Sequence, residues 1–316
     1  MKVFPILVLA FALVTESAFA REDNWIVHRH TRDDGLTNNA VRAVLRDSKG
    51  YVWMGTSNGL NRYDGHDYLE VVIDGGVPDN NYITSLLEDS NGRIWIGTAS
   101  GVCLYEPGKT NAVRFSPMAG DDFQVYQIIR ESAGTILIPD RESGFFRIDT
   151  EKFEVERIEK GENNLKYSPV AMCQDVNGVA WFINDDGTLY RSTNRLKSAE
   201  PVVLPADVSP FAGKRIHRMF YASGYILVGM TENVLTMNIR TGEYNINKSI
   251  SNIYAILPAS ENEFWAACDN GIVVYDADLN VLRNFLMTDL PGGGDGRQCP
   301  TARCWISALT EETAFG

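Results

Sequence analysis

A 17-residue block occurs twice in this chain, 42 residues apart, and this repeat limits the possible folds. Residues 47–63 read DSKGYVWMGTSNGLNRY, and residues 89–105 read DSNGRIWIGTASGVCLY. A period near 42 residues is typical of a propeller blade, in which four antiparallel strands form one sheet and successive sheets surround an axis. Helical periodicity is nearly absent. The repeat therefore predicts an all-β β-propeller and argues against an α-rich fold.

Weaker copies of the block continue along the chain and give six in total. They share a first turn, an aromatic or aliphatic residue three positions later, and a second turn. The first turn falls at Gly50, Gly92, Gly134, Gly178, Gly224 and Asn262. The next position is Trp53, Trp95, Leu137, Trp181, Leu227 and Trp265, and the second turn is Gly59, Gly101, Gly144, Gly187, Asn233 and Gly271. The sequence predicts six four-stranded blades over residues 21–288.

The first copy shows how one blade is built. We expect strands over 41–45, 51–55, 60–63 and 68–73. Asp47 can hydrogen-bond the backbone of its own turn, and glycine tolerates the positive φ of tight hairpins. Alternation places Trp53 and Gly55 on one face, where a large ring and a bare backbone can pack against the next blade. The fixed place of the tryptophans favours core packing over a carbohydrate-stacking surface.

Three runs in the first repeat resemble a known family. They are DGLTNNAV at 34–41, WMGT at 53–56 and GLNRYDG at 59–65, and they resemble the two-component regulator propeller repeat. The resemblance covers roughly residues 25–288 and is most specific in blades one and two. It implies a periplasmic sensor region of a hybrid histidine kinase or, less often, of a diguanylate cyclase. Such propellers usually have seven blades, followed by an immunoglobulin-like domain, a membrane helix and a cytoplasmic output module.

The N-terminal 20 residues have the pattern of a cleaved secretory signal peptide. Lys2 precedes an apolar run over 3–14, and Ala18-Phe19-Ala20 has the small-x-small pattern of a cleavage site. The apolar run is shorter than the ~20 residues that a membrane helix needs. We therefore expect a periplasmic location and no membrane-spanning segment in this chain.

Residues 289–316 contain a Gly-rich stretch and what we interpret as the start of an incomplete seventh blade. Residues 306–316 match 41–50 when one inserted residue is allowed, and 25–30 would form the outer strand of that blade. We therefore expect a fragment or a prematurely ended reading frame. Expressed alone, such a chain is expected to aggregate, because sheet edges and an apolar blade face would be exposed.

Composition narrows the range of partners. The net charge is −12, and no cluster of Lys and Arg is visible, which argues against nucleic-acid binding. We interpret Cys103, Cys173 and Cys268 as small buried hydrophobic residues. Cys299 and Cys304 could form a small disulfide loop in an oxidising compartment, and their redox state is left open.

No catalytic, metal or cofactor site can be assembled from the spacing of reactive residues. The histidines are scattered: His28 and His30 read as a surface pair, whereas His66 and His217 read as structural. The Gly-rich run 292–297 lacks the Gly-Lys-Ser/Thr ending of a phosphate-binding loop, so we interpret it as a flexible loop. The sequence therefore predicts a chain that is non-catalytic by itself, with no metal and no cofactor.

Propeller geometry indicates where a ligand would bind. Loops that enter each inner strand and turns between the second and third strands meet at one mouth of the ring. The candidate ligand-binding residues there are Thr37, Asn38, Asn39, Asn58, Asn80, Asn81 and Tyr82, with Ser57, Asp79 and Ser100 beside them. Polar, uncharged and aromatic side chains suit sugar hydroxyls, and they equally suit ordinary loop solvation.

We therefore expect a periplasmic ligand-sensing propeller that binds a small molecule or an oligosaccharide, and a homodimer in the full-length protein. One alternative is a free-standing periplasmic enzyme, such as a propeller lyase or a quinoprotein, which would need convergent His, Arg or carboxylate groups at the mouth. The others are an interaction scaffold and a non-functional truncated remnant.

Overall fold

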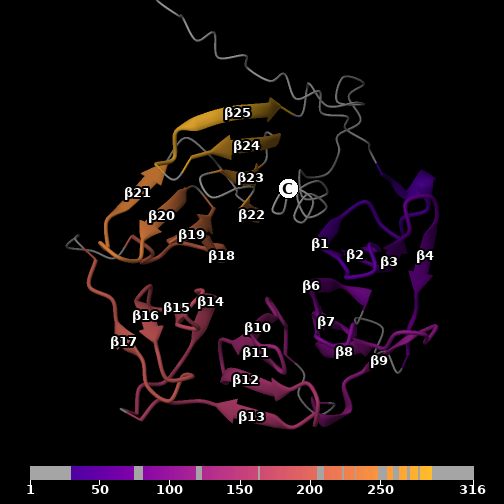
Figure 1. Ribbon diagram of the computed structural model, residues 1–316, viewed down its shortest axis with the longest axis horizontal. Helices are drawn as coiled ribbons and strands as arrows, with labels where there is room; N and C mark the ends of the chain where they lie inside the picture. Colours follow the sequence, from indigo (N-terminus) through magenta and orange to yellow (C-terminus); the bar gives the residue numbers. More distant parts are fainter. Residues whose placement is uncertain are drawn as a thin grey trace, which may run out of the picture.

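The six predicted blades are present and surround a common centre (Figure 1). The computed structural model describes residues 30–74, 81–118, 123–162, 164–204, 210–222, 224–231, 233–247, 255–258, 263–268, 271–276 and 278–286. Within these residues the regular structure consists of β-strands and two short 3₁₀ turns, η1 (Arg32–Asp34) and η3 (Ser116–Met118). The all-β propeller prediction is confirmed.

In each blade the strands pair in chain order, and the first strand lies nearest the axis (Figure 1). Blades one to three comprise β1 (Val41–Arg46), β2 (Val52–Thr56), β3 (Gly59–Tyr63) and β4 (Tyr68–Val71); β6 (Ile83–Glu88), β7 (Ile94–Thr98), β8 (Gly101–Tyr105) and β9 (Ala112–Arg114); and β10 (Ile129–Ser132), β11 (Thr135–Asp140), β12 (Gly144–Asp149) and β13 (Val155–Ile158). Blades four to six comprise β14 (Pro169–Gln174), β15 (Ala180–Asn184), β16 (Leu189–Ser192) and β17 (Glu200–Pro201); β18 (Ile216–Ala222), β19 (Tyr225–Met230), β20 (Val234–Asn238) and β21 (Tyr244–Asn247); and β22 (Ala255–Pro258), β23 (Phe264–Cys268), β24 (Gly271–Tyr275) and β25 (Val281–Leu286).

The outer strand of blade one is shorter than predicted. It ends at Val71, and the next two residues form β5 (Ile73–Asp74), which pairs in parallel with β9 of blade two. Blade two is therefore a five-stranded sheet. The outer strand of a sheet has backbone N–H and C=O groups on one side that lack a hydrogen-bond partner. A neighbouring segment of chain can form hydrogen bonds with them. The prediction of a single strand over 68–73 was wrong because this pairing depends on a neighbouring blade.

The first turn of the blade is held by its aspartate, as the sequence indicated. Oδ1 of Asp47 accepts hydrogen bonds from the backbone N–H of Lys49 (3.0 Å) and of Tyr51 (2.9 Å). Gly50 has φ of 88°, which allows the chain to reverse there. Equivalent pairs of bonds recur at Asp89 in blade two and Asp175 in blade four.

The space between blades is filled by large apolar side chains, as predicted for the tryptophans. Trp53 is 1% exposed, and its ring lies 4.8 Å from that of Tyr105 in blade two. Gly55 contacts blade two so closely that an added Cβ would lie 2.8 Å from Cβ of Ile83. Cys103 and Cys173 are buried in these interblade cores, which confirms their interpretation as small hydrophobic residues.

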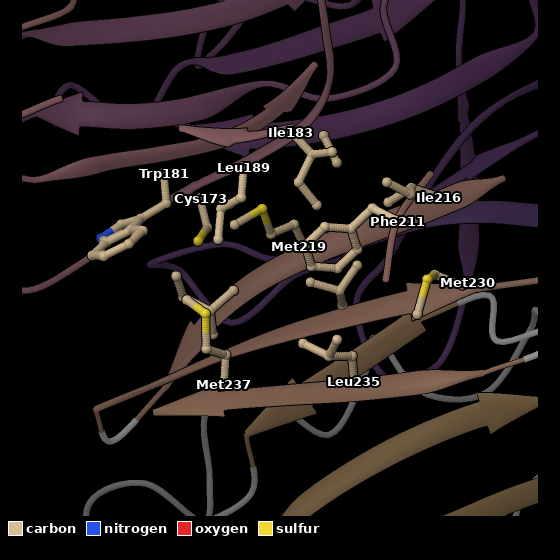
Figure 2. Close-up of a cluster of buried hydrophobic side chains, with 13 residues drawn as sticks. Cys173, Trp181, Ile183, Leu189, Phe211, Ile216, Met219, Met230, Leu235 and Met237 are labelled. Carbon is tan, nitrogen blue, oxygen red and sulfur yellow. The ribbon is translucent and has the colours of Figure 1, made fainter. Parts of the chain in front are cut away.

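One such core lies between blades four and five (Figure 2). Trp181 and Ile183 of β15 enter it from one side, and Met219 of β18 and Met237 of β20 enter it from the other. Because each of these interblade cores joins two sheets, neighbouring blades stabilise one another.

Several predictions fall outside the described residues. These are the signal peptide, the seventh-blade segments 25–29 and 306–316, the Gly-rich run 292–297, His28, Asn80, and the pair Cys299 and Cys304. Within the described ranges, no helix has the length and apolar character that crossing a membrane would require.

Candidate ligand-binding mouth

In each blade, two parts of the chain lie at the same edge of the ring. They are the start of the inner strand and the turn between the second and third strands. Backbone hydrogen bonds fix this arrangement. In each case a backbone N–H in the turn between the second and third strands donates to a backbone carbonyl just before the inner strand. These bonds run from Ser57 to Ala40 (2.9 Å), from Ala99 to Tyr82 (3.1 Å), from Asp185 to Ser168 (2.9 Å) and from Thr231 to Arg215 (3.1 Å). We call this edge the mouth. Within each of these blades the two loop sets meet as the sequence predicted.

Four inner strands carry a β-bulge close to the mouth. The pairing register skips one residue in β1, β6, β14 and β18, namely Arg42, Thr84, Val170 and His217. A bulge leaves one residue out of the ladder and re-aims its side chain, and such bulges are frequent beside binding sites. The mouth therefore has a set of side chains that do not follow the alternation of the sheet.

The predicted residues in the entry loop of blade one are used to hold that loop. Oγ1 of Thr37 lies 2.8 Å from Oδ1 of Asn61 and 3.1 Å from Oγ1 of Thr56. The amide oxygen of Asn38 accepts from the backbone of Ala40, and that of Asn39 accepts from the backbone of Arg32. These three side chains are half-buried, so the structure gives them a local structural role as well as a place near the mouth.

The other predicted residues lie more openly at the mouth. Asn58 and Asn81 are exposed, and Tyr82 is half-buried. The guanidinium of Arg42 lies over the Tyr82 ring, 4.4 Å from its centroid, and its Nε donates to Oγ of Ser57 over 2.7 Å. Blades one and two thus share an arginine–tyrosine pair that a polar loop residue orients.

An arginine from the opposite side of the ring reaches the same area. Arg218 lies on β18 of blade five, yet its Nη2 donates to the carbonyl oxygen of Thr84 on β6 of blade two over 3.0 Å. Its Nη1 donates to the carbonyl oxygen of Tyr126, which precedes blade three, over 2.7 Å. Strands β18 and β6 face each other across the centre in Figure 1. The Arg218 side chain therefore spans the central channel.

Tyr126 carries a second arginine–tyrosine pair. The residue is 38% exposed, and the guanidinium of Arg141 lies 4.9 Å from the centroid of its ring. Arg141 follows β11 in the turn that corresponds to Ser57–Asn58 of blade one. Three arginines from blades one, three and five thus lie around two tyrosines.

Sequence reasoning missed Arg42, Arg141 and Arg218 as site residues. A signal was present for two of them, because Arg42 and Arg218 stand inside short apolar strands where a charged side chain is costly unless it has a partner. The position of Arg141 could not be found in this way, because it lies in an ordinary polar turn.

The described histidines have separate surroundings. The His30 ring packs 5.3 Å from that of Tyr63, His66 lies in a turn capped by Asp64, and Nε2 of His217 lies 3.2 Å from Oγ1 of Thr231. Within the described residues, no three His, Cys, Asp or Glu side chains are placed to hold a metal ion.

A cavity of about 490 Å³ lies away from the mouth, between blades three and four. Two arginines of its lining, Arg147 and Arg195, form ion pairs. Arg147 pairs with Glu131 (2.8 Å) and Glu156 (2.6 Å), and Arg195 also pairs with Glu131 (2.8 Å). Burial raises the pKa of Glu131, but the hydrogen bonds from the two guanidinium groups outweigh it, so the pKa lies below its ordinary value. Arg147, Glu156 and Arg195 of the cavity lining therefore already have charged partners.

Comparison with known proteins supports the repeat assignment. The family described as two component regulator propeller matches residues 35–58 and 76–100. A 61-residue stretch is 34% identical to histidine kinase P4 of Formosa agariphila, which corresponds to 19% of this chain and 4% of that kinase.

Solved structures share the fold at low sequence identity. The extracellular domains of two B. thetaiotaomicron proteins described as hybrid two-component systems superpose with TM-scores of 0.62 and 0.63, at 20% and 19% identity. The matches cover 79% and 82% of this chain but only 37% and 36% of those chains. Virginiamycin B lyase from Staphylococcus aureus also superposes, with a TM-score of 0.59 at 15% identity over 77% of this chain and 83% of the lyase. The family match is therefore confined to two repeats, at residues 35–58 and 76–100, and the chain as a whole shares its propeller fold with these solved structures.

Proposed function

We propose that this propeller is the ligand-sensing part of a periplasmic two-component sensor and that it binds a solute, such as a glycan fragment, at the mouth. The observation that carries the proposal is the meeting of Arg42, Tyr82, Tyr126, Arg141 and Arg218 at one end of the channel. Ligand sites combine aromatic surface with a few oriented polar groups, and this arrangement supplies both.

A sensing role also agrees with the repeats and with the structural relatives, which are extracellular domains of proteins described as two-component systems. The signal would be passed on by parts that the relatives have beyond the region matched here. The proposal gives the propeller itself no catalytic residue, no metal and no cofactor.

A lyase is the second candidate, because virginiamycin B lyase shares the fold. A lyase or hydrolase needs an acid and a base within reach of the reacting bond. His217 is the titratable group at the bulge of β18, and its imidazole lies beside Thr231. Conversion of a bound compound would favour this candidate over sensing alone.

Titration calorimetry of the exported chain against neutral and acidic oligosaccharide pools tests the proposal. We expect saturable binding that Asn58→Ala and Asn81→Ala weaken by about 3- to 10-fold, since each removes a hydrogen-bonding side chain. Asn91→Ala is the matched control, because Asn91 is an exposed asparagine of blade two at the opposite edge. Absence of binding by a folded protein would overturn the proposal, and mass spectrometry of the recovered ligand would reveal turnover.

The periplasmic location has its own test. The mature protein should be released by osmotic shock from cells that express the full gene product, with its N-terminus after residue 20. Retention in the cytoplasmic fraction with residues 1–20 attached would contradict it.

A further inference from the structure

Arg218 is half-buried, and its partners differ from those of Arg147 and Arg93. Arg147 has carboxylate partners in Glu131 and Glu156, and Nε of Arg93 donates to Asp89 over 2.7 Å. Arg218 instead bonds two neutral carbonyl oxygens, and the described residues place no carboxylate within ion-pair distance of it. A guanidinium removed from water is costly unless an anion compensates it.

Desolvation acts on Arg218 without an opposing charge. Its pKa is lowered, and burial in the channel is the cause. An arginine keeps its charge over the physiological range even so, because its ordinary pKa exceeds about 12. The channel therefore contains a permanent positive charge, although the chain as a whole has a net charge of −12.

The carbonyl contacts also orient this charge. Nη1 and Nη2 are held by oxygens from two different blades, so the guanidinium plane is fixed before any ligand arrives. A fixed planar guanidinium recognises carboxylate or sulfate oxygens better than a mobile lysine would, because little entropy is lost on binding.

The surrounding charges place the anion on one side of the mouth. Arg42 lies over Tyr82 and Arg141 lies over Tyr126, next to the two carbonyl partners of Arg218. The corresponding turn of blade four carries Asp185 and Asp186, both exposed. In blade three, Asp140 and Glu142 flank Arg141, so the oriented guanidinium of Arg218 rather than a net local charge would select an anion, and the blade-four side would repel one and can accept hydrogen bonds from hydroxyl groups.

We propose that the mouth recognises an anionic saccharide, with its carboxylate or sulfate group bound by Arg218 and its ring placed between Tyr82 and Tyr126. The inference rests on the proposed function, because it names the class of the ligand at the same site. Arg42 and Arg141 add to the positive electrostatic potential at the mouth. Their positions over the two tyrosine rings limit the orientations that the sugar can take.

The test compares an acidic disaccharide with its uncharged methyl ester and with two sulfate-bearing probes. Digalacturonate, its dimethyl ester and a sulfated disaccharide are titrated into the exported chain by calorimetry at low salt, with inorganic sulfate as a further probe. We expect at least one of the anionic disaccharides to bind about 10- to 100-fold more tightly than the ester, because hydrogen bonds to a charged group are the stronger ones. Raising the salt concentration should weaken the anionic probe more than the ester.

Arg218 variants separate recognition from a structural role. Arg218→Met should remove the preference for the anionic probe, and Arg218→Lys should keep part of it. Arg130→Met is the matched control, because Arg130 also lies on an inner strand and donates to a backbone carbonyl, that of Glu88, but toward the opposite edge. If Arg218→Met does not fold, Arg218→Lys and the comparison of acid with ester in the unaltered protein decide the outcome.

The outcomes distinguish the two proposals. Binding of neutral saccharides with no preference for the anionic probes would overturn this inference and leave the proposed function standing. A loss in Arg218→Met that is equal for acid and ester would assign Arg218 a structural role and overturn it as well. Failure of every saccharide to bind would overturn the proposed function itself. If inorganic sulfate binds as tightly as the disaccharides, the sugar contributes nothing to recognition, and this result would overturn the inference that the ligand is a saccharide.

Discussion

The indole Nε1 of Trp53 donates a hydrogen bond to Oδ2 of Asp47 over 2.8 Å. The same bond joins Trp95 to Asp89 (2.9 Å) and Trp181 to Asp175 (3.2 Å). The aspartate thus holds its turn with one carboxylate oxygen and the buried indole with the other. A short turn motif and an interblade core residue form one unit, which explains why they recur together in the repeat.

Replacing Asp47 should destabilise the propeller more than replacing an exposed turn aspartate. Asp47→Ala leaves two backbone N–H groups and a buried indole N–H without their acceptor, and we expect the free energy of unfolding to fall by about 2–3 kcal/mol. Asp64→Ala is the control, because Asp64 also caps a turn but is exposed. Urea denaturation measures both, and equal midpoints would contradict the role assigned to the indole bond.

Gly55 should not tolerate a methyl group. In Gly55→Ala the added Cβ would overlap Ile83 of the next blade, and we expect a loss of about 1–3 kcal/mol in the free energy of unfolding. Gly134→Ala is the matched control, because no atom lies within 4 Å of its added Cβ. A less-than-additive loss in the double variant Gly55→Ala/Ile83→Ala would confirm the contact, and strict additivity would exclude it.

Glu131 should make stability depend on pH in the acidic range. Its pKa lies below the ordinary value in the folded state, so its contribution is present at neutral pH and is lost as the pH falls below about 4 through the lowered pKa. We expect Glu131→Gln to lower the free energy of unfolding at pH 7 by about 2 kcal/mol, and the difference should shrink at acidic pH. Denaturation curves at several pH values measure this.

Glu156→Gln provides the comparison for that experiment. Glu156 pairs with the same arginine, but its side chain is 62% exposed. The expected loss is below about 1 kcal/mol, because solvent screens an exposed pair. An equal effect of both substitutions would contradict the importance of burial.

The thiols of Cys103 and Cys173 should resist alkylation in the folded protein. Burial raises the pKa of Cys103 to about 11 and also raises that of Cys173, so the reactive thiolate is rare at pH 8. Labelling at these two positions, followed by peptide mass spectrometry, should rise with urea in step with unfolding. Rapid labelling without denaturant would contradict the placement of these cysteines in interblade cores.

The turns and the strand faces of the blade were predictable because each depends on residues that are close together in the sequence. Asp47 and Gly50 specify the turn, and the alternation of Trp53 and Gly55 specifies which face meets the next blade. The repeat then indicated how many such units the chain contains. Hydrogen bonds and packing over short separations depend on residue type and spacing, and both are visible in a sequence.

The loops that the sequence placed at one edge of the ring do meet there, and the structure adds residues to them. Asn58, Asn81 and Tyr82 lie at the mouth, as expected, whereas Thr37, Asn38 and Asn39 are bonded within the entry loop. The two arginine–tyrosine pairs were missed, because each joins residues that the sequence gives no reason to associate.

By itself the sequence determined the blade, the number of copies and the edge of the ring at which loops meet. Only the tertiary structure decided that Ile73 joins the sheet of blade two and that Arg218 reaches Thr84, 134 residues earlier in the chain. The reason is physical. A turn is stabilised by its own atoms, but a contact across the channel exists only after intervening blades have packed and set the width of the ring.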